Sequence, residues 1–190
     1  MLQYIAEYDK YVEITGYQKI SFNKAELYLK NNRKQTIQNV DLQFFNAELI
    51  ATQEHLYFAV LNALQAFKNK TNLSKSPAME TMLYASAQRQ IQKAIERCGI
   101  KPTTQNMATV IIGDDPKQIE DTLVEITKKV GSKPNEKVLA LTKTKEAKIK
   151  KAFEITDEEI KTVVEEKDGS QEKAIVNLVI ERMALLATRL

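Results

Sequence analysis

One short apolar segment sets the strongest limit on how this chain can fold. Residues 107–112 read MATVII, an apolar and β-branched run that ends at a Gly-Asp-Asp sequence, residues 113–115. Such a run, bounded by residues that favour turns, predicts a buried strand. Pro116 follows at the position that proline favours in the first turn of a helix. The sequence therefore predicts a buried strand followed directly by a helix over residues 116–130.

The other predicted elements mix strands and helices without strict alternation. Residues 4–18 are rich in β-branched and aromatic side chains around a turn at residues 8–10, which predicts a hairpin, and residues 42–45 predict a short strand. Apolar residues at helical spacing predict helices over residues 21–32, 52–70, 74–86, 88–98, 144–153 and 171–188, with another beginning at Thr156. At 190 residues the chain can bury its own core. We expect one mixed α/β (α+β) domain, residues 1–190, with a small mixed sheet packed against several helices.

Local signals predict how several of these helices begin and end. Thr52 is a candidate N-cap, and Thr156 with Glu159 fits the capping-box spacing. Gly99 closes helix 88–98, where the freedom of glycine at positive φ suits a C-cap. The lysine-rich residues 143–151 are expected to form a solvated helix face.

The sequence lacks the residue spacings that catalytic, metal or nucleotide sites require. We expect His55, the single histidine, to be bonded to a neighbour at a helix surface, and Cys98, the single cysteine, to pack quietly. The candidate carboxylate pairs, residues 114–115 and 157–159, lie at predicted helix starts, where acids favour the helix dipole. The expectation is a protein that is not an enzyme, with no catalytic residues, no metal and no cofactor.

Nothing in the sequence suggests a membrane protein. No apolar run approaches the length that spans a bilayer, and the first ten residues, MLQYIAEYDK, lack the features of a signal peptide. We therefore expect a cytoplasmic protein without a membrane partner.

Positive charge is concentrated in one part of the chain. The net charge is +3, but residues 66–101 carry seven cations, including Lys75, against two acids. Within helix 88–98, spacing places Arg89, Lys93 and Arg97 in one cationic stripe. This stripe suits the phosphates of RNA, to whose bases Tyr84 could add a flat surface. The alternatives are a solvated outer face for the stripe and a core position for Tyr84.

The last predicted helix is apolar on two faces. One broad face suits docking on the core. Leu178 and Leu185 belong to a narrower second stripe that Arg182 borders. A helix of this kind is either wholly buried or presents one face to another protein.

A family resemblance adds to this interpretation. Residues 74–100, SKSPAMETMLYASAQRQIQKAIERCGI, resemble the signature of the small KEOPS subunit, the family of the human PRPK-binding protein TPRKB, of which this chain looks like an archaeal-type member. The matching positions are Glu80, Ser86, Arg89, Gln90, Ile91, Ala94, Gly99 and Ile100. Ala87 departs from the pattern, because many archaeal members have glycine there.

The resemblance implies a non-catalytic subunit of the KEOPS complex, which makes threonylcarbamoyladenosine (t6A) in tRNA. In that family the subunit binds the kinase-like ATPase subunit, and in archaea it resembles a module that recruits tRNA by its single-stranded 3′ CCA tail. We assign RNA contacts to Lys75, Arg89, Lys93, Arg97 and Tyr84, and partner contacts to Leu178, Arg182 and Leu185. The other KEOPS subunits would be contacted indirectly. The alternative is a pure protein-interaction activator of the ATPase subunit without direct RNA binding.

Overall fold

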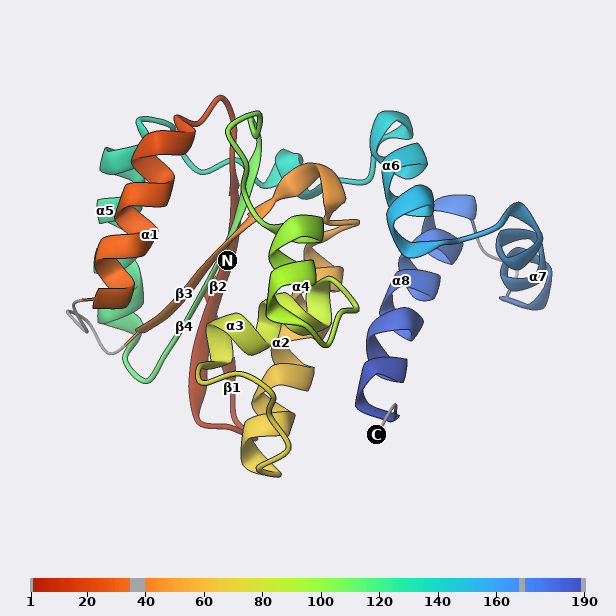
Figure 1. Cartoon of the computed structure of the whole chain (residues 1–190), viewed down its shortest axis with the longest axis horizontal. Helices are drawn as coiled ribbons and strands as arrows, with labels where there is room; N and C mark the ends of the chain where they lie inside the picture. The colour runs from red at the N-terminus through yellow and green to blue at the C-terminus, as the bar shows by residue number, and fades with distance from the viewer. Residues whose placement is uncertain (1, 35–39, 168–169, 189–190) are drawn as a thin grey trace.

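A four-stranded antiparallel sheet forms the centre of the fold. The computed structural model describes residues 2–34, 40–167 and 170–188 (Figure 1). Within them the strand order is β1-β2-β4-β3, with every pairing antiparallel. The bounds are β1 Gln3–Ile5, β2 Lys10–Tyr17, β3 Val40–Asn46 and β4 Met107–Gly113. The mixed α/β class, the hairpin and both predicted strands are confirmed. The sheet itself is not mixed as we expected, because all of its described pairings are antiparallel.

The central strand β4 is buried along its whole length, as its sequence predicts. It pairs with β2 on one side and β3 on the other, and successive side chains point to opposite faces of the sheet. Ala108, Val110 and Ile112 enter one hydrophobic core, whereas Met107 and Ile111 enter a second. Helices must therefore cover both faces of this sheet.

Two helical layers provide this cover (Figure 1). Helices α1 (Phe22–Lys34) and α5 (Pro116–Val130) pack against each other and on one face. Helices α2 (Gln53–Lys68) and α3 (Pro77–Ala85) pack on the other, and α4 (Ile91–Cys98) follows α3. Two short 3₁₀ turns lie in connections between these elements: η1 (Ala47–Leu49) follows β3, and η2 (Glu136–Leu139) follows α5.

The remaining three helices form a separate cluster beside α2 and α3. They are α6 (Lys143–Phe153), α7 (Asp157–Lys167) and α8 (Gln171–Thr188), and they share a third hydrophobic core. Met183 and Leu186 of α8 belong instead to the core between the sheet and α2. None of the described helices is long and apolar enough to cross a membrane.

The predicted start signals are confirmed at two helices. The Thr52 hydroxyl accepts from His55 N–H, which caps α2. At α7, Glu159 Oε2 accepts from Thr156 N–H at 2.8 Å, and Glu159 N–H donates to Thr156 Oγ1 at 3.2 Å. This reciprocal pair is the capping box that the spacing predicts.

Two local predictions are confirmed only in part. Gly99 is the C-cap of α4, as predicted, but its φ is −71°, so a left-handed backbone is not the reason for glycine there. A Cβ there would lie 2.5 Å from the Ile95 carbonyl oxygen, which makes close approach the reason for glycine. The lysine-rich helix is not solvated throughout, because Lys145 is only 4% exposed and its Nζ donates to the Val138 carbonyl at 3.2 Å.

His55 is buried, not at the helix surface as we expected. Its Nδ1 accepts from Ala51 N–H at 3.1 Å, and its Nε2 lies 2.9 Å from the Ala85 carbonyl oxygen. Because a backbone N–H can only donate, Nδ1 is unprotonated and Nε2 carries the hydrogen. Burial lowers the pKa of this imidazole to about 4. Cys98 is also buried, as we expected, and burial raises the pKa of its thiol to about 12.

The buried imidazole predicts a specific loss of stability in acid. Below the ordinary pKa of 6.5 the unfolded chain binds a proton at His55, whereas the folded chain binds one only near pH 4. Lowering the pH across this window should therefore reduce the free energy of unfolding by roughly 3 kcal/mol through this group alone. Denaturant unfolding of wild type and His55→Gln at pH 7, 5.5 and 4.5 measures it. A stability difference between the two proteins that does not change with pH contradicts the assignment.

Candidate functional site

The turn between α3 and α4 has the geometry of a Schellman motif. Ala87 N–H donates to the Tyr84 carbonyl at 2.8 Å, and Gln88 N–H donates to the Leu83 carbonyl at 3.0 Å. Ala87 itself lies at φ 50°, in the left-handed region. After this turn α4 begins at Ile91, so Arg89 and Gln90 lie before the helix and not within it, as the predicted helix 88–98 would have placed them.

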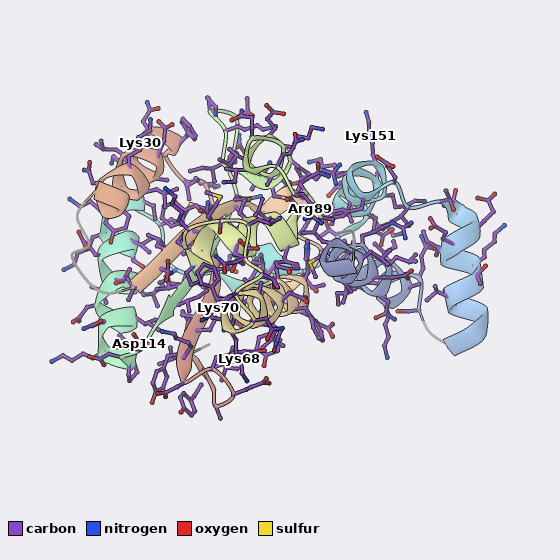
Figure 2. All side chains as sticks on the ribbon, turned by 60° about the horizontal axis from the view of Figure 1, so that its bottom comes forward. Lys30, Lys68, Lys70, Arg89, Asp114 and Lys151 are labelled. Carbon is purple, nitrogen blue, oxygen red and sulfur yellow. The ribbon has the colours of Figure 1, made fainter. Side chains whose placement is uncertain are left out.

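Most of the predicted RNA-binding cations are exposed. Lys75, Arg89 and Lys93 are exposed, as is Lys70, and none of them forms an ion pair within the described residues. Lys68 differs, because it pairs with Glu7 at 3.3 Å. In Figure 2, Lys68 and Lys70 lie at the end of α2 and Arg89 lies beside α4, whereas Lys30 lies on α1.

Arg97 does not belong to an exposed stripe. It is half-buried, its Nη1 donates to the Ser86 carbonyl at 3.0 Å, and its guanidinium lies 5.8 Å from the centre of the Phe153 ring. The predicted three-residue stripe is therefore not continuous: Arg89 precedes the helix and Arg97 turns toward the end of α6. In this structure Arg97 therefore links the turn after α3 to the end of α6.

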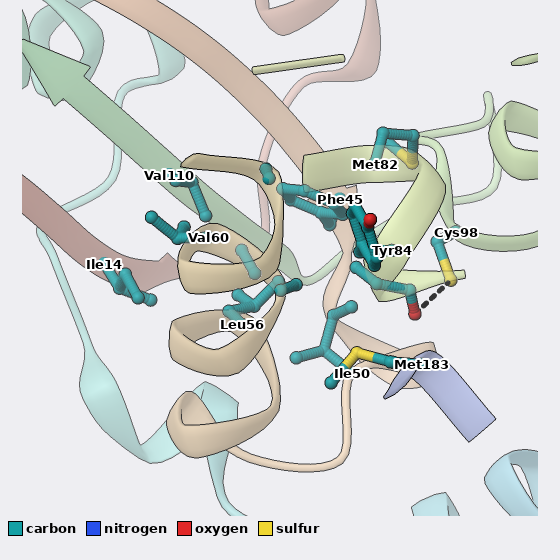
Figure 3. Close-up of a cluster of buried hydrophobic side chains, with 14 of the residues drawn as sticks. Ile14, Phe45, Ile50, Leu56, Val60, Met82, Tyr84, Cys98, Val110 and Met183 are labelled. Atoms are coloured by element: carbon teal, nitrogen blue, oxygen red, sulfur yellow. Dashed lines mark hydrogen bonds between the residues drawn. The ribbon is translucent and has the colours of Figure 1, made fainter. Parts of the chain in front are cut away.

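Tyr84 is a core residue, which agrees with the alternative interpretation of its position. It is buried in the core between the sheet and α2, with Phe45 and Cys98 nearby (Figure 3). Burial raises the pKa of its phenol. A base could not stack on this ring without displacing the residues that cover it.

The three partner residues predicted on α8 have different surroundings. Leu178 is 4% exposed and packs in the core that α6, α7 and α8 share. Arg182 forms an ion pair with Glu159 of α7. Leu185 is 37% exposed. The second stripe is thus buried within the chain at Leu178, and it reaches the surface at Leu185, near the C-terminal end of α8.

The described residues offer no metal centre, because no three histidine, cysteine, aspartate or glutamate side chains are placed to hold an ion.

Comparison with known proteins bears on the function of this chain. The model of the family "Kinase binding protein CGI-121" matches residues 18–187. This chain belongs to the CGI-121 family. A "Regulatory protein Cgi121" of Methanocaldococcus jannaschii is 34% identical over 113 residues, which are 60% of this chain and 70% of that protein.

This CGI-121 protein also has a polar cluster that we did not predict, in which Glu48 and Asn106 are half-buried and Lys148 is exposed. Glu48 of η1 accepts from Lys148 Nζ at 2.7 Å and from Asn106 Nδ2 at 3.0 Å, and the bond from Lys148 lowers the pKa of its carboxyl. Lys145 lies near this carboxylate, and burial lowers the pKa of its ammonium to about 8. The sequence holds a signal for this burial, because Lys145 shares a helix face with Ile149 and Phe153 at four-residue spacing.

The left-handed alanine predicts a stabilising substitution. An L-residue with a side chain is strained by about 1 kcal/mol at this backbone conformation, and glycine is not. The greater freedom of glycine in the unfolded chain offsets part of this gain, so Ala87→Gly should raise the free energy of unfolding by roughly 0.5 kcal/mol. Ala140→Gly is the matched control, because Ala140 has a φ of −68° and glycine should destabilise there. Denaturant unfolding measures both, and a destabilising Ala87→Gly contradicts the strain argument.

Proposed function

We propose that this protein is a non-catalytic, cytoplasmic subunit of the KEOPS complex for t6A modification of tRNA. In this proposal it binds the kinase-like ATPase subunit and recruits tRNA by the single-stranded 3′ CCA tail. Membership of a family described as kinase-binding is the observation that carries the first part. The relative's description as a regulatory protein supports a role without chemistry of its own.

The surface proposed for the ATPase subunit lies at the C-terminal part of α8. Leu185 and the neighbouring Ala184 and Glu181 are exposed there, beyond the part of the helix that packs in the core shared with α6 and α7. An exposed leucine on a helix that is otherwise docked favours contact with a protein. Arg182 would act at the edge of this surface while it stays paired with Glu159. Leu178 is removed from the proposal, since it is buried within the chain.

The surface proposed for RNA flanks α3 at both ends. Lys70 and Lys75 precede this helix, and Arg89 and Lys93 follow it. All four are exposed and lack ion pairs to described acids, so each can neutralise a phosphate without breaking a bond within the chain. Arg97 and Tyr84 are not proposed as direct RNA contacts. Arg97 contacts Ser86 and Phe153 within the chain, and Tyr84 is buried in the core.

The alternative, a pure activator of the ATPase subunit, also has an observation in its favour. Several basic side chains of the same region are held in internal contacts: Lys68 by Glu7 and Tyr8, and Arg97 by Ser86 and Phe153. Fewer cations are then available for RNA than the sequence suggests. Salt dependence separates the two, because phosphate binding weakens steeply with salt and an apolar interface does not.

The tRNA proposal predicts salt-sensitive binding that requires the CCA tail. Arg89→Ala/Lys93→Ala should weaken binding of full-length tRNA and make its salt dependence shallower by about 1.4 in slope, at about 0.7 for each single-stranded phosphate contact. Titration of tRNA, with and without the tail, at two salt concentrations measures this.

Lys24→Ala/Lys128→Ala is the matched control for that experiment. It removes the same charge from exposed positions on α1 and α5, in the opposite helical layer, and should leave tail-dependent binding intact. Equal weakening by both double variants would indicate that tRNA responds to the overall positive electrostatic field of the protein and not to a specific site. Equal, weak binding of wild type to both RNAs would favour the pure activator.

The partner proposal predicts a selective effect at Leu185. A charge in the centre of an apolar contact is costly, so Leu185→Asp should weaken binding to the ATPase subunit by roughly tenfold or more. Leu27→Asp is the control, because Leu27 is 60% exposed on α1, in the far layer. Calorimetric titration with the ATPase subunit measures both variants. Unchanged affinity of Leu185→Asp would exclude this end of α8 from the interface.

A further inference from the structure

A buried carboxylate shapes the loop that joins α2 to α3, residues 69–76. Glu80 of α3 is only 1% exposed. Both of its oxygens lie 3.1 Å from the backbone N of Leu73, and Oε2 accepts from Ser74 N–H at 2.7 Å. No ion pair to Glu80 occurs among the described side chains. Backbone donors of the loop therefore satisfy this carboxylate in place of a cation.

Further bonds fix the loop at both of its ends. Lys70 lies at φ 58°, and Thr71 N–H donates to the Ala66 carbonyl at 2.9 Å, which closes α2 with a left-handed residue. At the other end, Ser74 Oγ donates to the Ser76 carbonyl at 2.9 Å, and Ser76 caps α3. Glu80 holds the middle, between these two anchors. The backbone of the whole loop is thus determined by contacts within the chain.

The fixed loop carries side chains that have no evident role in the fold. Lys70 and Lys75 are exposed and unpaired with described acids, and Leu73 between them is 48% exposed. Lys70 and Lys75 differ in this respect from Lys68, whose charge is neutralised by an ion pair with Glu7. Fixing a backbone in advance reduces the ordering cost when a ligand binds to the side chains that it carries.

We propose that Glu80 is a positioning residue for RNA binding. It holds loop 69–76 in the shape that presents Lys70 and Lys75 to the phosphates of single-stranded RNA. This inference rests on the RNA-recruiting function proposed above and adds to it the loop before α3 and the buried group that shapes the loop. Glu80 itself touches no RNA, because it lies beneath the loop backbone.

The proposal and simple electrostatics predict effects of opposite sign. Replacing Glu80 by glutamine removes a negative charge near a basic surface, which by field effects alone should strengthen RNA binding. If Glu80 acts by positioning the loop, the same substitution weakens RNA binding. A glutamine has only one acceptor oxygen, and its NH₂ group is a donor that would face the donor N–H groups of the loop. The sign of the change therefore distinguishes the two.

The test compares Glu80→Gln with wild type, Lys70→Ala/Lys75→Ala and the combined triple variant. The RNA probe is full-length tRNA at two salt concentrations, and hydrogen exchange follows the amides of Leu73 and Ser74. We expect Glu80→Gln to accelerate exchange at both amides and to weaken binding severalfold. The lysine pair should make the salt slope shallower by about 1.4. The triple variant should bind little worse than the lysine pair, since both changes act through the same contacts.

Glu96→Gln is the matched control, because Glu96 is an exposed acid of α4 whose loss should leave binding unchanged or tighter. Binding to the ATPase subunit should stay unchanged in Glu80→Gln, which excludes general unfolding. Wild-type-like or tighter RNA binding by Glu80→Gln overturns the positioning role and leaves recruitment intact. Should this variant not fold, an unchanged salt slope in the lysine pair overturns the inference. Wild type without salt-sensitive tRNA binding overturns both the inference and the recruiting function.

Discussion

The buried imidazole of His55 contacts three parts of the molecule that lie far apart along the chain. Its Nδ1 accepts from the segment before α2, and its Nε2 donates to the last residue of α3. Its ring also lies 5.6 Å from Phe153, at the end of α6, in an edge-to-face contact. A neutral imidazole has one donor and one acceptor, and both are used here. The segment before α2, the end of α3 and the end of α6 therefore share one anchor.

Two buried or half-buried charges fix the two ends of α3 in complementary ways. Glu80 accepts from backbone N–H groups of the loop before the helix, and Arg97 donates to the Ser86 carbonyl at its end. Charged groups bond backbone more strongly than neutral ones do. The positions of Lys75 and Arg89, which flank α3 and remain exposed, thus depend on charged residues that do not themselves reach the surface. This division separates the residues that shape the basic surface from those that would contact a polyanion.

The sequence predicts the elements of this fold well, because their signals are local. The apolar run of β4, the caps at Thr52 and Thr156 and the helical spacing of α8 are each complete within a few residues. The surroundings of side chains were not predictable in the same way. Arg97 has the spacing of a surface cation, and its partner Phe153 lies 56 residues away along the chain. Leu178 is on a second apolar face, and no local signal identifies the residues of α6 and α7 that share its core.

In the proposed function, the two surfaces are held in a fixed relation. Arg97 links the turn after α3 to Phe153 of α6, and Met183 and Leu186 of α8 pack into the core beside α2. The exposed end of α8 and the basic residues around α3 thus belong to elements that pack against one another. A tRNA bound at one surface would be held at a defined distance from an ATPase subunit bound at the other. Such an adaptor raises the effective concentration of its two ligands for each other without any chemistry of its own.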